Sequence, residues 1–338
     1  MSPPPNLPRG KRLLQNLALF AGTFFLCVAA FEVVLRLNGY GNLEIYAPDA
    51  KLYWKLKPNQ DCFTKVDHQP VHVNSHGTRG PEFETDKPPS TLRILSLGDS
   101  RTFGWGLTDA ETYSRQLERR LRELGGSRRV EVINAGVNAW SFPQMLVFFR
   151  DTALRYTPDV VVIGDANLWT QFSEKNSPEF VRSFMRRVWL KNLLRRSAIY
   201  HFVVEVKLRN FYERHRGKFI PVDPNQDALF KEQQQKDPDA LFRNAIEDLC
   251  RIAISNHVAP VLLFLPTLDD LARTNSAVLK SKQAIHEKWN IPLVDLTTNL
   301  QPLGKALYLD ADPVHGDAQA NEMIARRLFE TVTNLTAP

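Results

Sequence analysis

From residue 91 to the C-terminus, short apolar runs of strand length alternate with segments of helical periodicity. The run LRILSLGD at 92–99 precedes ETYSRQLERRLREL at 111–124, where Tyr113, Leu117 and Leu121 recur at helical spacing. Such alternation predicts parallel strands joined by right-handed helical crossovers, and therefore a three-layer α/β sandwich. The runs that we expect to form the parallel sheet are 92–99, 130–137, 158–167, 259–267 and 291–296.

The N-terminal region contains an uncharged apolar segment from Leu13 to Phe31. As a helix rising about 1.5 Å per residue, it is just under ~30 Å long, which is the hydrocarbon thickness of a bilayer. Arg9, Lys11 and Arg12 precede it and few basic residues directly follow it, so the N-terminus is expected in the cytoplasm and the chain from about Gly39 outside. We therefore expect a single-pass protein of the inner (cytoplasmic) membrane with its main domain on the periplasmic side.

A cleaved signal peptide is the alternative interpretation of this segment, because Val28-x-Ala30 could serve as a small-residue cleavage site. The apolar stretch exceeds the ~7 to 15 residues of a typical signal-peptide core, which favours a retained anchor. The sequence from Tyr40 to about Ser90 is rich in Pro, Asn and Gly and predicts a connector with a short hairpin. The expected divisions are an anchor at 1–37, a connector at 38–90 and a main domain at 91–338 with a helical insertion at about 169–236.

The chain of 338 residues carries a formal net charge of +6. This balance favours anionic surroundings such as phospholipid headgroups, acidic glycans or nucleic acid. Nucleic acid is not expected as a partner, because an exported domain would meet little of it. Three cysteines are too few for a disulfide framework, and Cys62 and Cys250 are the only pair outside the apolar segment that could form a bridge.

The expected insertion has a basic and amphipathic sequence, VRSFMRRVWLKNLLRRSAIYHFVVEVKLRNFYERH at 181–215. One interpretation is a helix that lies on an anionic leaflet, which suits a chain already tethered to a membrane. The other is a solvated helix that packs on the domain through its apolar face. The sequence leaves both open.

Polar residues follow the strands at the edge where a parallel sheet binds ligands, beyond the carboxyl ends of the strands. Ser100 comes directly after the first predicted strand, and Asp312 and His315 come after the last. A serine hydroxyl is a poor nucleophile until a base takes its proton, and an imidazole acts as that base when a carboxylate orients it. Ser100, His315 and Asp312 are therefore the candidate nucleophile, base and orienting group.

The oxyanion that forms on an attacked carbonyl needs hydrogen-bond donors already in place. The backbone N–H groups of Ser100 and Gly136 and the side-chain amide of Asn167 would serve, since each lies at the carboxyl end of a predicted strand or directly after it. Gly136 suits this role because a bare backbone lets a substrate oxygen come close.

These blocks resemble a known family. GDSRTFGWG at 98–106, NAGV at 134–137 and DPVH at 312–315 resemble the first, second and fifth blocks of the SGNH (GDSL-like) hydrolases. NSHGTRGPEF at 74–83 resembles the approach segment of membrane-anchored members. The resemblance implies a flavodoxin-like three-layer α/β/α sandwich, the SGNH hydrolase fold, without a metal or organic cofactor. It implies the same roles for Ser100, Asp312 and His315 in catalysis and for Gly136 and Asn167 in the oxyanion hole.

The third block departs from the family pattern, which is usually Gly-x-Asn-Asp. Here Asn167 follows Asp165 and Ala166 and precedes Leu168. A carboxylate beside an oxyanion site would oppose the developing negative charge, so Asp165 is expected to point away. Arg101, directly after the candidate nucleophile, is expected to pair with Asp99 or Asp165, or to meet an acidic substrate.

The expected function is that of a serine esterase or acylhydrolase that acts on carboxylic esters, with O-acyl esters of cell-envelope polysaccharide as the favoured substrate. A non-catalytic scaffold or glycan-binding subunit of an acyl-transfer or polysaccharide assembly complex is the alternative from another class. An O-acetyltransferase or a lipid esterase is a further alternative. The spaced histidines His68, His72 and His76 do not predict a metal site, because Pro70 and Gly77 interrupt any helix that would place them on one face.

Overall fold

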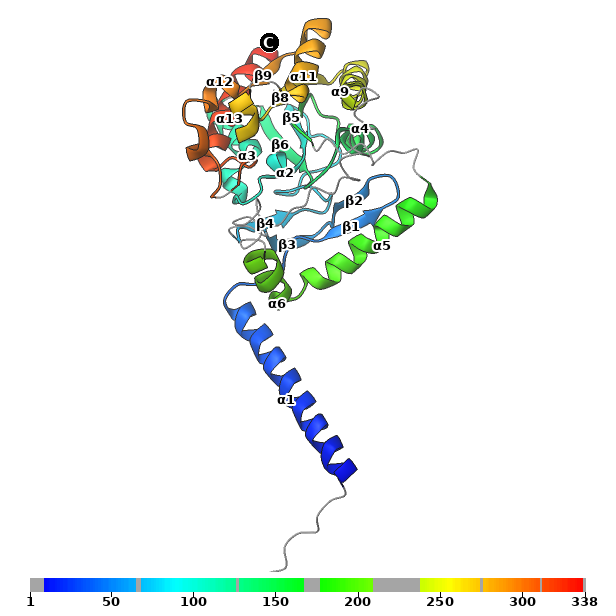
Figure 1. Cartoon of the computed structure of the whole chain (residues 1–338). Coiled ribbons are helices and arrows are strands. Elements are labelled where there is room, and N and C mark those ends of the chain that lie inside the picture. The colour runs from blue at the N-terminus through cyan, green and yellow to red at the C-terminus, as the bar shows by residue number, and fades with distance from the viewer. Residues whose placement is uncertain are drawn as a thin grey trace, which may run out of the picture.

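A five-stranded parallel sheet forms the centre of the main domain (Figure 1). The computed structural model describes residues 9–64, 68–125, 128–166, 177–208, 238–273, 276–310 and 312–336. The order β6-β5-β7-β8-β9 is that of a flavodoxin-like sheet, with the switch point beside β5, where ligands bind at the carboxyl ends. The expected α/β fold is confirmed. The strands are β5 (Thr91–Gly98), β6 (Arg129–Gly136), β7 (Val160–Ile163), β8 (Ala259–Phe264) and β9 (Leu293–Asp295).

Helices cover both faces of this sheet, which explains why β5 is buried along its whole length. On one face α3 and α13 pack against each other over a core that includes Ile94, Val162 and Leu263. On the other face α4, α9 and α11 cover Leu95, Ile163 and neighbouring residues. These helices are α3 (Tyr113–Glu123), α4 (Phe142–Asp151), α9 (Pro238–Ser255), α11 (Ala277–Trp289) and α13 (Ala318–Thr336).

Short helices fill the connections between these layers. The one that matters most for the site is α2, a single turn that follows β5 directly. The short elements of the domain are α2 (Ser100–Phe103), the 3₁₀ turns η1 (Asp109–Glu111), η2 (Ala153–Tyr156) and η4 (Gly304–Leu307), and the helices α10 (Leu268–Arg273) and α12 (Thr297–Leu300).

The segment expected as a connector forms two antiparallel hairpins rather than one. Trp54, Leu56, Cys62 and Val73 from these hairpins are buried in the same core cluster as the residues of β5. The hairpins are therefore packed on the sandwich, and they extend the domain toward the N-terminus. Their strands are β1 (Tyr46–Asp49), β2 (Tyr53–Leu56), β3 (Gln60–Phe63) and β4 (Pro70–Val73).

A single apolar helix, α1 (Arg9–Leu37), extends away from the domain (Figure 1). Within the described residues it is the one helix long and apolar enough to cross a membrane, and no residue of its most apolar stretch is buried. Three helical elements of the expected insertion lie beside the hairpins and the end of α1 nearest the domain: α5 (Pro178–Arg195), α6 (Ala198–Tyr200) and the π-helix η3 (His201–Leu208). Cys62 and Cys250 are both buried and free, so the possible bridge is not formed.

Candidate active site

Ser100 lies at the sharp turn between β5 and α2. Asp99 begins the helix, and its Oδ1 accepts a hydrogen bond from the N–H of Arg101 at 2.9 Å. The chain turns back closely over the end of the strand, because a Cβ on Gly98 would lie 2.0 Å from Thr102 Oγ1. A glycine before the turn is therefore required, and the turn places Ser100 at the first residue of a helix at the carboxyl edge of the sheet.

The structure brings Ser100, His315 and Asp312 together in one hydrogen-bonded chain. The Nε2 of His315 lies 2.8 Å from Ser100 Oγ, and its Nδ1 lies 2.8 Å from Asp312 Oδ2. The other carboxylate oxygen of Asp312 accepts the N–H groups of Val314 at 2.8 Å and His315 at 3.1 Å. Burial alone would raise the pKa of Asp312, but its hydrogen bonds with His315 and these N–H groups lower it. Asp312 is therefore a carboxylate at neutral pH.

The indole of Trp105 packs against the ring of His315, with centroids 5.6 Å apart and planes 25° from parallel. Trp105 follows α2 within the GWG sequence, so one short segment supplies both Ser100 and one wall of the imidazole site. Arg79, from the segment before β5, donates to the carbonyl oxygens of Phe103 at 2.8 Å and Gly104 at 2.7 Å. This buried guanidinium fixes the end of α2, and with it the turn that carries Ser100.

Gly136 does not meet the expectation for an oxyanion donor. Its backbone N–H donates to Asn134 Oδ1 at 3.0 Å, so it is already engaged. Its missing side chain serves packing instead, because a Cβ there would lie 2.2 Å from the backbone nitrogen of Phe103. The absence of a side chain on Gly136 therefore allows β6 to pack closely against α2. Gly136 does not line the pocket that opens over Ser100.

Ala139 is a residue that the sequence analysis missed. It lies in the loop after β6, lines the same pocket as Ser100 and His315, and has a left-handed backbone with φ of 66°. Few residues with a side chain adopt this conformation, which clusters at functional sites. Within the described residues, no hydrogen-bond acceptor is assigned to the N–H groups of Ser100 or Ala139. The first hairpin holds this loop: Trp54 Nε1 donates to the carbonyl of Asn138 at 3.0 Å, and Asn138 Nδ2 donates to Tyr46 Oη at 2.8 Å.

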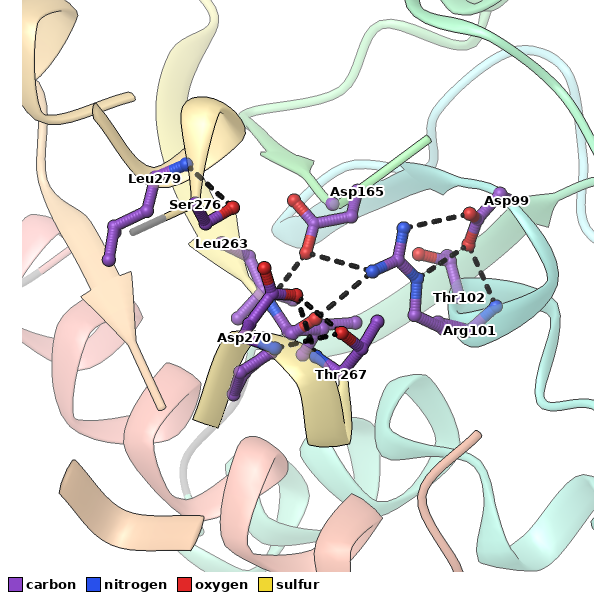
Figure 2. Close-up of polar contacts among 12 residues, drawn as sticks. Asp99, Arg101, Thr102, Asp165, Leu263, Thr267, Asp270, Ser276 and Leu279 are labelled. Carbon is purple, nitrogen blue, oxygen red and sulfur yellow. Dashed lines mark hydrogen bonds and ion pairs between the residues drawn. The ribbon is translucent and has the colours of Figure 1, made fainter. Parts of the chain in front are cut away.

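Asn167, the other candidate donor, lies outside the described residues. Both carboxylate oxygens of Asp165, two residues before it, accept hydrogen bonds. Its Oδ1 accepts from Lys282 Nζ at 2.5 Å, and its Oδ2 accepts from the N–H of Leu265 at 2.6 Å. Arg101 also lies 3.5 Å from Asp165 Oδ2 (Figure 2). The negative charge of Asp165, beside the predicted oxyanion site, is therefore compensated by the cations of Lys282 and Arg101.

Arg101 forms its closest ion pair with Asp99, whose Oδ2 accepts from Nη2 at 2.9 Å (Figure 2). It also donates to the carbonyl of Leu265 at 3.0 Å. Burial would lower the pKa of Arg101, but the carboxylates of Asp99 and Asp165 outweigh it and raise the pKa above its ordinary value. Arg101 thus pairs with both aspartates, where the sequence predicted one or the other. These contacts tie the turn that carries Ser100 to the ends of β7 and β8.

Lys282 on α11 was not identified from the sequence. Its ammonium group is completely buried and donates to Asp165 and to the carbonyl oxygens of Gly164 at 3.0 Å and Leu263 at 2.5 Å. Burial lowers the pKa of Lys282, and Asp165 acts in the opposite direction. The residue links helix α11 to the carboxyl ends of β7 and β8, immediately before the segment that contains Asn167.

A pocket of about 1090 Å³ opens over Ser100 and His315. Its far wall is the inner side of α5, where Phe184 stacks on Trp54 with centroids 5.2 Å apart. The pocket is as large as the clefts that hold drug-sized ligands. It combines aromatic and polar side chains: Tyr46, Trp54, Trp105, Phe184, Asn138, Lys191, Asn192, Arg195 and Thr267.

Polar contacts fix α5 against the first hairpin. The side chain of Asn192 accepts from the N–H of Tyr46 at 3.1 Å and donates to the carbonyl of Tyr46 at 2.5 Å. The buried guanidinium of Arg195 donates to the carbonyl of Glu44 at 2.5 Å and packs over the Tyr46 ring. This helix of the insertion is therefore an integral wall of the pocket.

The three spaced histidines have separate surroundings. His72 lies 2.7 Å from Asp61, His76 lies 2.9 Å from the carbonyl of Phe83, and His68 stacks on Phe63. Among the residues that the structure describes, no group of three or more His, Cys, Asp or Glu side chains is placed to hold a metal ion.

No protein-family model matches the chain, and no curated protein matches its sequence. Several solved structures are similar to it in fold. A protein of the lipolytic G-D-S-L family from Desulfitobacterium hafniense has 13% identity and a TM-score of 0.43, over 71% of this chain and 98% of that chain. A catalytic mutant of an acetylxylan esterase from Geobacillus stearothermophilus has 13% identity and a TM-score of 0.46, over 71% and 94%. A lipase/acylhydrolase from Enterococcus faecalis has 15% identity and a TM-score of 0.45, over 72% and 96%.

Proposed function

We propose that this protein is a serine esterase of the SGNH type that cleaves carboxylic esters through an acyl intermediate on Ser100. The observation that supports this most strongly is the continuous hydrogen-bonded chain from Asp312 through His315 to Ser100. It joins segments 212 residues apart in the sequence at the edge of the sheet where ligands bind.

The first half of the reaction forms the acyl intermediate. Ser100 Oγ attacks the ester carbonyl while His315 Nε2 takes the hydroxyl proton, and Asp312 stabilises the resulting imidazolium. The tetrahedral intermediate then collapses: the ester C–O bond breaks, and His315 returns the proton to the leaving alcohol. The acyl group remains on Ser100.

The oxyanion is held by the N–H groups of Ser100 and Ala139 in this proposal, with Asn167 as the side-chain donor. Two features support Ala139, rather than Gly136, as the second backbone donor. Ala139 lines the pocket and its N–H has no hydrogen-bond acceptor among the described residues, whereas the N–H of Gly136 is bound to Asn134. Donors that are free before the substrate arrives need no reorganisation when the charge develops.

The second half of the reaction releases the acyl group. His315 deprotonates an acceptor hydroxyl, which attacks the acyl carbonyl, and Ser100 leaves with the proton from the imidazolium. Water as acceptor gives hydrolysis, and a sugar hydroxyl gives acyl transfer, so the choice depends on how far the occupied pocket excludes water.

O-acyl esters of cell-envelope polysaccharide are the substrate class that we propose. The pocket is large, and its aromatic residues Tyr46, Trp54 and Trp105 lie among the hydrogen-bonding side chains of Asn138 and Asn192. Aromatic faces beside polar groups suit sugars, which present both apolar and hydroxyl-bearing surfaces. The proposed location is the periplasmic side of the inner membrane, anchored by α1, which the basic residues before this helix favour.

Hydrolysis of a short-chain aryl ester tests the proposal. Ser100→Ala and His315→Ala are each expected to lower kcat/KM by about 10³-fold or more, because the hydrogen-bonded residues act as a unit. Ser255→Ala, which removes an exposed hydroxyl on α9, is the matched control and should retain full activity. A non-catalytic scaffold predicts instead that the wild type is no more active than Ser100→Ala.

A further inference from the structure

Helix α5 exposes large apolar side chains on the side that faces away from the pocket. Trp189 is 61% exposed, Leu190 and Leu193 are each 52% exposed, and Leu194 is 45% exposed. Contiguous apolar side chains of this size on a surface mark an interaction site, because their exposure to water is unfavourable. The opposite side of the helix, with Phe184 and Val188, already packs on the hairpin core.

The same outward side of α5 is strongly basic. Of the six basic residues in 178–196, Lys191 and Arg195 line the pocket and the other four are exposed. The one acidic residue, Glu179, pairs with Arg182 at 2.9 Å. Arg186, Arg187 and Arg196 are exposed beside the apolar side chains. A surface that is both apolar and cationic is complementary to the headgroup region of an anionic bilayer, where Trp is also favoured.

Contacts with α1 place this surface beside the end of the apolar helix that is nearest the domain. Glu32 of α1 accepts hydrogen bonds from Ser197 Oγ at 2.9 Å and from the N–H groups of Ala198 at 2.9 Å and Ile199 at 3.0 Å. Arg36 donates to the carbonyl of Arg196 at 2.6 Å. The end of α5 is thus joined to the last turns of the apolar helix, and Figure 1 shows α5 extending sideways from that point.

We propose that the outward face of α5, formed by Trp189, Leu190, Leu193, Arg182 and Arg186, docks on the outer leaflet of a bilayer that contains anionic phospholipid. Helix α1 crosses the membrane and α5 lies on it, so the domain is held at two places rather than hanging from one. The inner side of α5 walls the pocket, so docking brings the pocket to within about one helix diameter, ~10 Å, of the headgroups. This inference depends on α1 crossing the membrane and does not depend on ester hydrolysis.

Depth-dependent fluorescence quenching of the full chain tests the proposal. The chain is placed, one copy per nanodisc, in phosphatidylcholine with phosphatidylglycerol, with nitroxide lipids labelled either near the headgroup or deep in the acyl chain. Helix α1 contains no Trp, so quenching reports on the domain. We expect stronger quenching by the shallow label, and we expect Trp189→Phe to remove most of it. Trp289→Phe, which removes a 37% exposed Trp on α11, is the matched control and should leave the quenching unchanged.

A second comparison tests the charge complementarity. Arg182→Ala/Arg186→Ala/Arg187→Ala should lose most of the increase in quenching that phosphatidylglycerol produces, whereas Arg119→Ala/Arg326→Ala on α3 and α13 should not. Quenching that is the same in wild type and Trp189→Phe would overturn the proposal. So would shielding of Trp189 that occurs in vesicles with many copies but not in single-copy nanodiscs, because that result assigns the face to a second copy of the chain.

Discussion

Gly136 illustrates how a single residue can be important for a reason other than the one its motif suggests. Its N–H donates to Asn134 and an added Cβ would lie 2.2 Å from the backbone nitrogen of Phe103, so the glycine allows close packing under the turn that carries Ser100. Gly136→Ala should therefore lower the free energy of unfolding by about 1 to 3 kcal/mol, the usual range for overpacking, and reduce the proposed esterase activity by displacing α2. Thermal unfolding measures this.

The matched control is Gly22→Ala in α1, where no atom lies within 4 Å of the added Cβ. This variant should unfold at the wild-type temperature. Equal stability of Gly136→Ala and the wild type would show that β6 and α2 are not packed as described.

Asp312 gives a prediction that depends on pH. Its folded-state pKa is lowered, so the carboxylate stabilises the fold at all pH values above its unfolded pKa of about 3.9, and this contribution is lost as the pH falls through the folded value. The stability that wild type has over Asp312→Asn should therefore be present above the unfolded pKa and shrink in acid. Denaturant unfolding from pH 7 to about pH 2 measures it. A difference that persists unchanged in acid would contradict the lowered pKa.

At the scale of elements, the ion pair between Lys282 and Asp165 links α11 to the carboxyl ends of β7 and β8. Lys282→Met leaves a buried carboxylate with less compensation and should cost about 3 to 5 kcal/mol of unfolding free energy. Lys282→Met/Asp165→Asn removes both charges and should recover part of that loss. Chemical denaturation of both variants tests this, and a double variant no more stable than the single one would count against the pair as the connection.

The strands could be predicted from the sequence because buried parallel strands are continuous apolar runs. The prediction for β7, 158–167, was too long at both ends. Asp159 bonds instead to the N–H of Arg93 and to Lys87, and Asp165 turns toward Lys282. Pairing across 117 residues leaves no local signal, so the sequence could not reveal the buried lysine.

The site residues that belong to local sequence motifs could be predicted, whereas a residue that the hairpins hold in place could not. Ser100, Asp312 and His315 each follow a strand in a recognisable block. Ala139 has no such signal, because its left-handed conformation depends on contacts of the preceding Asn138 with Trp54 and Tyr46 in a segment that reads as a connector. The family resemblance predicts two further oxyanion donors, the N–H of Gly136 and the side-chain amide of Asn167. In the structure the N–H of Gly136 donates to Asn134 instead, and Asn167 lies outside the described residues.

Across the molecule, the apolar helix, the insertion and the edge of the sheet that carries Ser100 form one connected arrangement. Glu32 joins α1 to the segment after α5, Arg195 joins α5 to the first hairpin, and Trp54 of that hairpin holds the loop of Ala139. The geometry of the pocket thus depends on segments that precede and interrupt the sandwich. Two-place attachment would keep this pocket at a fixed height above the membrane.

Covalent labelling with a fluorophosphonate, followed by peptide mapping, tests whether Ser100 is an activated nucleophile. The reagent reacts with a serine hydroxyl only where a base and oxyanion donors activate it. The proposed mechanism predicts one label per chain, located on Ser100, and its loss in His315→Ala. An unlabelled wild-type chain, or a label on another residue that His315→Ala leaves in place, would contradict it.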